Sequence, residues 1–218
     1  MATRIKICCI ASVAEAELAI AQGADALGLV SAMPNGPGVI GEATIASIAE
    51  AVPPGVARFL LTSKVNIDAI VDQQRRLGAD VLQIVDRLAP GDHARLRRAL
   101  PAGIRLVQVI HVTGPDSVEE ARQAGESCDA ILLDSGNQML AVKELGGTGR
   151  VHDWTISRRI RDALRVPIFL AGGLRPDNVT VAIGAVAPFG VDVCSGVRTD
   201  GRLDPEKLAA FAAAVRST

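Results

Sequence analysis

The 218-residue sequence contains no tyrosine, one tryptophan and four phenylalanines, so aromatic residues make up only 2% of it. This scarcity argues against a nucleic-acid-binding surface, because proteins bind single strands largely by stacking bases on aromatic side chains. The formal net charge is −1 and no block of Lys and Arg residues is present, so the electrostatic footprint of a nucleic-acid-binding protein is missing as well. We therefore expect no nucleic-acid partner.

Long apolar runs and metal-binding motifs are also missing. No stretch of 18 apolar residues occurs, and the first residues read as a strand rather than as a signal peptide, so we expect no membrane association. The cysteines are Cys8, Cys9, Cys128 and Cys194; they form no C-x-x-C pair and have no histidine pair nearby, which argues against zinc. Neighbours in a strand point to opposite faces, so Cys8 and Cys9 would make a poor disulfide. We expect a reduced, cytoplasmic protein.

What the sequence does contain is a regular alternation of short apolar runs and longer amphipathic runs, without a composition break that would mark a linker. The apolar runs predict strands buried on both faces, as parallel strands are. The predicted strands are 5–10, 24–30, 56–62, 80–85, 104–110, 128–134, 166–172 and 190–196. The predicted helices are 12–23, 41–52, 66–78, 91–100, 116–125, 153–164, 175–186 and 204–215. We expect one α/β domain spanning residues 1–218.

Eight β–α units in a chain of this length fit either a closed (β/α)8 (TIM) barrel or an open doubly wound sheet. A dinucleotide-binding doubly wound sheet should carry G-x-G-x-x-G after its first strand, and "CCIASVAEA" lacks that motif. The glycine-rich turns lie instead after the last three strands, as "GGTG", "AGGL" and "SGV". Barrels often bind phosphate at the loops after strands seven and eight, so this distribution favours the barrel.

The three glycine-rich turns are candidates for a phosphate site. Glycine lets backbone N–H groups approach an anion closely and adopts the φ values that such turns need. Each turn alone is equally well explained as an ordinary tight turn, but three consecutive turns favour a phosphorylated small-molecule ligand. The residues assigned to this site are Gly147, Thr148, Gly149, Gly172, Gly173, Ser195 and Gly196.

The first strand places a thiol at the predicted mouth of the barrel. Side-chain alternation puts Lys6 and Cys8 on the interior face and Cys9 on the face that packs against helices. A lysine two residues below a thiol favours the thiolate that a base or nucleophile requires. By position alone, however, Cys8 is slightly better explained as a small buried hydrophobic residue, and Cys9 is expected to be inert packing.

The sixth strand supplies a carboxyl group at the same end of the barrel. In "AILLDS", alternation puts Asp134 in phase with Ala130 and Leu132. A carboxyl group after an apolar strand is costly unless it is used or paired, and its alternative role is an Asx cap on the next loop. A thiol and a carboxyl group facing each other across the mouth would place a base and an acid on opposite sides of a substrate.

In order along the chain, "KICCI", "GADALGLV", "LLDS", "GGTG" with "DW" soon after, "LAGGLRPDNV" and "VDVCSGV" resemble the landmarks of the phosphoribosylanthranilate isomerase family. The resemblance covers nearly the full length and is most specific in the C-terminal half. It implies a (β/α)8 barrel of tryptophan biosynthesis that needs no metal or cofactor and catalyses an Amadori rearrangement. It further implies that Cys8 is the general base, Asp134 the general acid, and the three turns the site of the ribose phosphate. Asp192 aligns with a family Asp and would contact sugar hydroxyls, or else is a strand-end turn residue.

The chain departs from the family pattern at the end of the substrate that carries the anthranilate carboxylate. Gly38 stands where the family has an Arg that meets this carboxylate, and Val85 replaces a His. Gln108 replaces a Lys, Cys9 a Gly and Arg198 a Glu. Arg87 and His111 lie at the predicted mouth and could supply a cation, although a solvated surface charge explains each of them better.

Three hypotheses therefore stand. The first is a phosphoribosylanthranilate isomerase with a modified carboxylate anchor. The second is a paralogous isomerase of another phosphorylated aminoaldose or sugar phosphate, and the third is a non-catalytic barrel that binds phosphorylated metabolites. The presence of both Cys8 and Asp134 argues against the third. Composition does not decide between a monomer and a homodimer.

Overall fold

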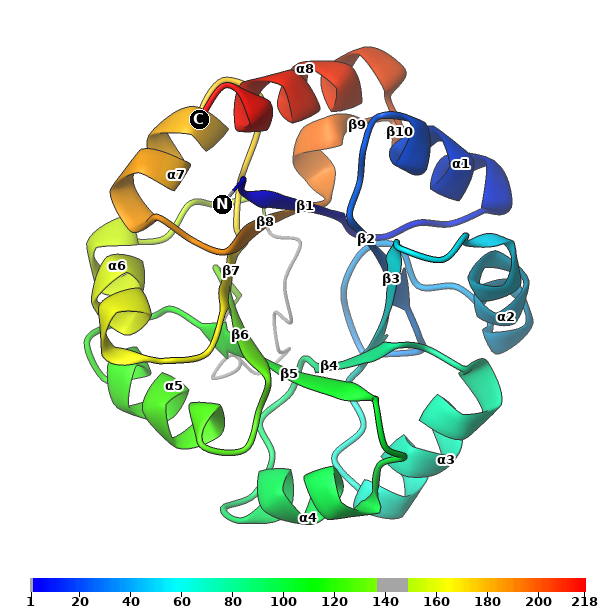
Figure 1. Cartoon of the computed structure of the whole chain (residues 1–218), viewed down its shortest axis with the longest axis vertical. Coiled ribbons are helices and arrows are strands. Elements are labelled where there is room, and N and C mark those ends of the chain that lie inside the picture. The colour runs from blue at the N-terminus through cyan, green and yellow to red at the C-terminus, as the bar shows by residue number, and fades with distance from the viewer. Residues whose placement is uncertain (1, 137–148) are drawn as a thin grey trace.

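The computed structural model describes residues 2–136 and 149–218. Eight parallel strands close into a barrel in chain order, and helices form a ring outside it (Figure 1). The strands are β1 (Arg4–Ile7), β2 (Ala26–Val30), β3 (Ala57–Thr62), β4 (Val81–Ile84), β5 (Arg105–His111), β6 (Ala130–Asp134), β7 (Ile168–Leu170) and β8 (Gly190–Val193). The helices are α1 (Val13–Ala21), α2 (Glu42–Ala51), α3 (Ile67–Leu77), α4 (Asp92–Ala99), α5 (Ser117–Gly125), α6 (Trp154–Ala163), α7 (Val179–Val186) and α8 (Pro205–Arg216). The expected (β/α)8 barrel is confirmed.

Local sequence explains where several helices begin and end. The Ser12 hydroxyl accepts a hydrogen bond from a first-turn amide of α1, and the Asp204 carboxylate accepts two from the first turn of α8. Pro205 at the start of α8 costs no hydrogen bond, because its amide would lack a partner in the helix anyway. Gly78 ends α3 in the left-handed conformation (φ 61°) that glycine adopts without strain.

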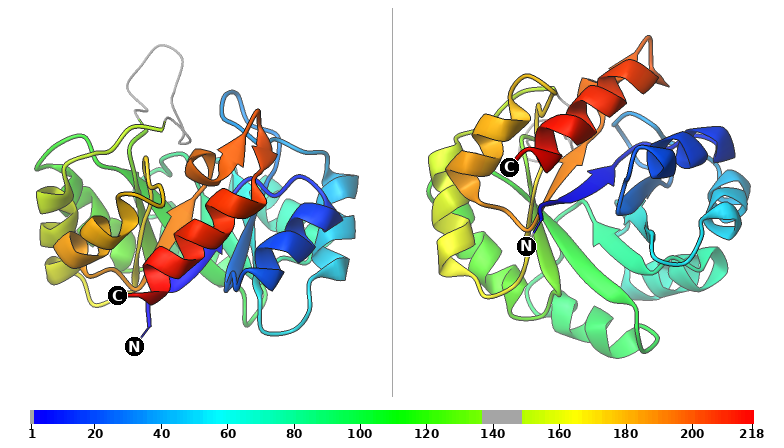
Figure 2. Two further views of the ribbon diagram at one scale, coloured as in Figure 1. Left: turned by 90° about the horizontal axis from the view of Figure 1, so that it is seen from above. Right: turned by 45° about the horizontal axis from the view of Figure 1, so that its top comes forward.

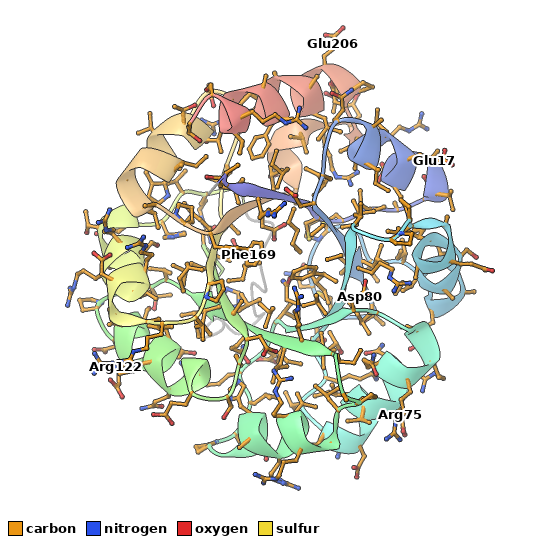
Figure 3. The ribbon with its side chains drawn as sticks, in the orientation of Figure 1. Glu17, Arg75, Asp80, Arg122, Phe169 and Glu206 are labelled. Atoms are coloured by element: carbon orange, nitrogen blue, oxygen red, sulfur yellow. The ribbon has the colours of Figure 1, made fainter. Side chains whose placement is uncertain are left out.

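The strands are buried on both faces and separate two apolar layers. The outer layer lies between strands and helices, and contains residues such as Leu27, Leu60 and Ile131. The inner layer fills the barrel with residues such as Val30, Leu61 and Phe169. Figure 3 shows Phe169 on β7 directed into the barrel, whereas labelled helix residues such as Glu17 and Arg122 point outward. The alternation that the sequence predicts therefore sets which side chains enter the barrel.

The first strand is shorter than predicted. β1 ends at Ile7, although the Cys8 amide still donates to the Val193 carbonyl on β8 at 2.8 Å. Cys9 has a φ of +63°, in the left-handed region that side chains other than glycine rarely adopt. Strand alternation therefore stops after Cys8.

A short hairpin after β8 was not predicted. The 3-10 turn η1 (Ser195–Val197) leads into β9 (Arg198–Thr199), which pairs antiparallel with β10 (Arg202–Leu203). Asp200 (φ 50°) and Gly201 (φ 77°) form the connection, and an Asp-Gly pair is a strong hairpin signal. Figure 2 shows this hairpin towards the face at which β8 ends, whereas both chain termini lie at the opposite face.

Candidate functional site

Cys8 and Asp134 line the same pocket at the carboxyl ends of the strands. Cys8 follows β1 directly and Asp134 is the last residue of β6. Asp192 on β8, Gly149, Gly172, Gly173 and Ser195 line the pocket as well. The structure thus brings the predicted acid, the predicted base and parts of all three glycine-rich turns to one place.

Gly149 and Arg150, the described end of the first glycine-rich turn, lie against the turns after β7 and β8. Gly149, Gly172 and Gly173 have φ values of 69°, 82° and 62°, so each uses the conformational freedom of glycine. A Cβ on Gly173 would lie 2.6 Å from the Arg150 carbonyl carbon, which shows how closely the first two turns pack. The Asn178 side chain holds the second turn by donating to the Gly173 carbonyl at 2.9 Å. Such a fold of amide-rich turns suits an anion.

Gly196 has a packing role and does not line the pocket. A Cβ built on it would lie 1.9 Å from the Leu174 carbonyl oxygen, so the turn after β8 rests directly on the turn after β7. Gly147 and Thr148, which were also predicted to bind phosphate, lie outside the described residues.

We expect Gly196→Ala to separate these two turns. Overpacking costs about 1–3 kcal/mol, so the free energy of unfolding should fall by that amount and the affinity for inorganic phosphate should fall with it. Urea unfolding and phosphate titration measure the two effects. Gly184→Ala on α7 is the matched control: nothing lies near the new methyl group, and the helix should gain up to about 1 kcal/mol. Equal behaviour of the two variants would contradict the packing role of Gly196.

A buried ion pair lies beneath Cys8. The Lys6 ammonium is fully buried and lies 2.9 Å from the Asp192 carboxylate. Burial alone would lower the pKa of Lys6, but the charges of Asp192 and Cys8 outweigh burial and raise this pKa above its ordinary value. Gly28 on β2 makes room for both groups, since a Cβ there would lie 2.9 Å from the Cys8 sulfur and 3.1 Å from the Lys6 nitrogen. Asp192, predicted to contact the sugar or form a turn, is thus the partner of Lys6.

Asp134 is half-buried, and one of its oxygens accepts a hydrogen bond from the Ser135 amide at 2.7 Å. This bond is the local cap that the sequence offered as an alternative, and it leaves the carboxyl group in the pocket. His152 near Asp134 was missed by sequence analysis, although it stands in the "HDW" stretch. Its Nε2 lies 2.7 Å from the Ser157 hydroxyl, and burial lowers its pKa while the charge of Asp134 acts in the opposite direction.

The prediction that Cys9 packs against the helices is wrong. Cys9 lines the pocket together with Cys8, and its sulfur lies 2.7 Å from the Cys194 sulfur. The reason is the left-handed backbone at Cys9, which ends the alternation on which the prediction depended. The Cys9 carbonyl accepts a hydrogen bond from Arg198, whose side chain also pairs with Glu15 at 2.9 Å.

The structure does not bring Arg87 or His111 into the pocket. Arg87 is exposed and pairs with Glu120 at 2.6 Å, beside helix α5. His111 is buried, and its Nε2 donates to the Val85 carbonyl at 3.2 Å. Gln108 is directed away from the pocket, where its amide nitrogen donates to backbone carbonyls and its oxygen lies 2.7 Å from His93.

One side of the pocket is apolar. Val30, Met33, Leu61, Val85 and Val109 line it. Within residues 2–136 and 149–218, the charged side chains that line the pocket are two carboxylates, those of Asp134 and Asp192. In that part of the chain, the pocket lining therefore contributes no Lys or Arg towards a carboxylate on a ligand.

The described part of the chain contains no group of three or more His, Cys, Asp or Glu side chains arranged to hold a metal ion. None of its helices has the length and apolar character needed to cross a membrane.

Comparison with known proteins supplies the family. The family model described as N-(5'phosphoribosyl)anthranilate (PRA) isomerase matches residues 5–214. The chain belongs to this family. Its members are aldose–ketose isomerases, so the protein is an enzyme of the N-(5'-phosphoribosyl)anthranilate isomerase family, which acts in tryptophan biosynthesis.

Individual relatives agree with this family. The N-(5'-phosphoribosyl)anthranilate isomerase of Methanothrix thermoacetophila is 37% identical over 218 residues, and the match covers 99% of both chains. The crystal structure of phosphoribosyl anthranilate isomerase from Thermotoga maritima has a TM-score of 0.84 at 28% identity, covering 99% of this chain and 100% of the other. A further isomerase structure, at 27% identity with a TM-score of 0.81 and coverage of 99% and 100%, contains reduced 1-(o-carboxyphenylamino)-1-deoxyribulose 5-phosphate.

Proposed function

We propose that this protein catalyses the Amadori rearrangement of N-(5'-phosphoribosyl)anthranilate to 1-(2-carboxyphenylamino)-1-deoxyribulose 5-phosphate, with Asp134 as general acid and Cys8 as general base. The observation that carries the proposal is that these two side chains, which lie far apart in the sequence, line one pocket together with residues of the glycine-rich turns. Family membership supports the substrate, since the relatives carry the name of this activity.

The reaction needs one acid and one base. The Asp134 carboxylic acid protonates the furanose ring oxygen, so the ring opens to a Schiff base between C1 and the amine. The Cys8 thiolate then removes the proton from C2, which gives an enolamine that tautomerises to the ketone. Both steps are proton transfers, and a positioned side chain typically accelerates such a step by about 10²–10⁴-fold.

The turns after β6, β7 and β8 hold the phosphate in this proposal. Gly149, Gly172, Gly173 and Ser195 line the pocket, and backbone amides of such turns donate to phosphate oxygens. The phosphate then fixes the distance of the ribose from the strand ends. Holding the substrate in a fixed position lowers the activation barrier, because the entropy of bringing the reacting groups together is already lost on binding.

The apolar side of the pocket supports a second candidate, a related isomerase of another phosphorylated aminoaldose. Gly38 replaces the cationic residue expected from the family pattern, and a Cβ there would lie 2.4 Å from the Cys9 Cβ. A longer side chain at position 38 therefore does not fit this backbone. Losing a charge-assisted contact to a carboxylate costs about 1.5–3 kcal/mol, which weakens binding of the anthranilate substrate without preventing turnover.

The test uses the purified protein and freshly prepared N-(5'-phosphoribosyl)anthranilate, whose fluorescence falls on turnover. We expect turnover. The matched comparison is N-(5'-phosphoribosyl)aniline, which lacks the carboxylate. The values of kcat/KM for the two substrates should differ by less than about tenfold, because the described pocket lining has no cation that would bind the carboxylate and so favour the anthranilate compound. No turnover of either compound would overturn the proposed function, whereas turnover of the aniline compound alone would favour the second candidate.

A further inference from the structure

Cys9 and Cys194 form a thiol pair at the mouth of the pocket. Their sulfur atoms lie 2.7 Å apart, compared with about 2.05 Å in a disulfide. Both are free thiols at the ends of adjacent strands, β1 and β8. The backbone there is held in register, because Ile7 pairs with Val193 and the Cys8 amide donates to Val193. A short movement of the two side chains would therefore bring the sulfur atoms to the distance of a disulfide bond.

The backbone at Cys9 is strained, with a φ of +63°. A residue other than glycine in the left-handed region costs of order 1–3 kcal/mol. The position is tightly determined: Arg198 donates to the Cys9 carbonyl at 2.5 Å, and Gly38 packs against the Cys9 Cβ. A glycine would fit here without strain. An observed outlier beside an active site is a reason to ask what its side chain does.

The two thiols differ in their surroundings. The contact with Cys9 lowers the pKa of Cys194, burial opposes this shift, and the charge of Arg198 lowers the pKa further. The same contact raises the pKa of Cys9, and burial raises it further. Both residues line the pocket, but Cys194 is half-buried whereas Cys9 is buried, so Cys194 is the thiol that a small oxidant reaches more readily. An accessible thiol whose pKa is lowered, beside a second thiol that can resolve it, is the arrangement of a redox-sensitive pair.

We propose that Cys9 and Cys194 form a reversible disulfide, an oxidative modification site for small hydroperoxides at the mouth of the pocket. The Cys194 thiolate attacks the peroxide oxygen, the O–O bond breaks, and the alcohol or water leaves with a proton, so that Cys194 becomes a sulfenic acid. The Cys9 sulfur then attacks the Cys194 sulfur, the S–O bond breaks, and the hydroxyl group leaves as water with the Cys9 proton. A dithiol reverses the reaction by thiol–disulfide exchange.

Oxidation changes the pocket through the neighbours of the pair. Cys9 follows Cys8 directly, and Cys194 precedes Ser195 of the turn after β8. The Cys9 sulfur also lies 3.5 Å from the Pro37 carbonyl in the loop after β2, a contact that a disulfide removes. The activity change rests on the proposed function, but formation of the disulfide does not.

The primary test is the mass of the intact protein. We expect a few equivalents of hydrogen peroxide to remove about 2 Da from the reduced protein, and dithiothreitol to restore the mass. After protease digestion of the oxidised protein, the disulfide should link the peptide of residues 7–58 to the peptide of residues 166–198. Cys8→Ser should keep the link, whereas Cys9→Gly and Cys194→Ser should lose it. Cys128→Ser, which changes a buried thiol elsewhere, is the matched control and should behave as wild type.

The second readout is turnover. We expect peroxide to lower kcat/KM of the wild type by at least about tenfold and dithiothreitol to restore it, and the loss that dithiothreitol reverses should be smaller in Cys9→Gly, where only oxidation of single thiols such as Cys8 remains. A gain of oxygen mass without the loss of 2 Da, or a link that survives in Cys9→Gly, would overturn the proposal. Because the mass is measured without substrate, failure of the proposed function would leave this result unaffected.

Discussion

Replacing Asp134 with Asn is expected to lower kcat/KM for N-(5'-phosphoribosyl)anthranilate by at least about a hundred-fold, because ring opening then lacks its proton donor. The amide keeps the shape of the side chain, and its oxygen can still accept from the Ser135 amide, as the Asp134 carboxylate does at 2.7 Å. The contact between position 134 and the Ser135 amide should therefore be kept. The measurement is steady-state turnover followed by substrate fluorescence.

Cys8→Ala should slow the enzyme by a similar factor, since removal of the C2 proton then lacks its base. The two variants combined should lose less than the product of the single effects, because residues that act in one reaction are not additive. Binding of inorganic phosphate, measured separately, should be unchanged in both, as the turns after β7 and β8 are intact.

The controls are the same two substitutions made at a Cys and an Asp outside the pocket. Cys128 is buried and Asp162 pairs with Arg158 on the surface of α6; neither lines the pocket. Cys128→Ala and Asp162→Asn should leave kcat/KM within about twofold of wild type, as substitutions outside the reacting groups usually do. Rapid turnover in both Asp134→Asn and Cys8→Ala would remove the proposed mechanism.

Lys6→Met is the substitution with the largest expected effect on stability. Methionine matches the length of the lysine stem, but it leaves the Asp192 carboxylate, only 7% exposed, without the ammonium that lies 2.9 Å away. The Lys6 ammonium also lies 5.2 Å from the centre of the Phe59 ring, so a cation–π contact is lost too. Breaking a buried ion pair by removing one partner costs about 3–5 kcal/mol. Urea unfolding of the purified variant measures the loss.

A double variant tests the cause of this loss. In the Lys6→Met background, Asp192→Asn removes the unpaired charge and should recover part of the stability. The control is Arg158→Met, which breaks the exposed pair with Asp162 and should cost less than about 1 kcal/mol. A loss below about 1 kcal/mol for Lys6→Met would show that the pair does not stabilise the barrel.

Much of the fold follows from short-range patterns. Eight apolar runs separated by amphipathic ones predicted the strands, and capping residues such as Ser12 and Asp204 mark helix starts. The placement of Lys6 in the barrel follows from strand alternation, because the opposite face must pack against helices. The Asp200-Gly201 pair is a local hairpin signal, because both residues accept the positive φ that the connection requires.

The site was predictable where it lies in regular strands and not where the chain leaves them. Asp134 is still in β6, and Cys8 keeps its backbone bond to β8, so both point into the pocket as expected. Cys9 is one residue further, and its left-handed φ of +63° turns it towards Cys194 rather than towards the helices. Arg87 was predicted at the mouth by position, but an ion pair with Glu120 holds it outside.

The sequence by itself determined the alternation of strands and helices, the order of the landmarks and the presence of a carboxyl group and a thiol at the strand ends. These depend on side-chain periodicity and on residues close in the chain. Only the tertiary structure decided which distant groups meet: Lys6 with Asp192, Cys9 with Cys194, and Arg198 with Glu15. The physical reason is barrel closure, which brings β8 beside β1 and sets their register across more than 180 residues of chain.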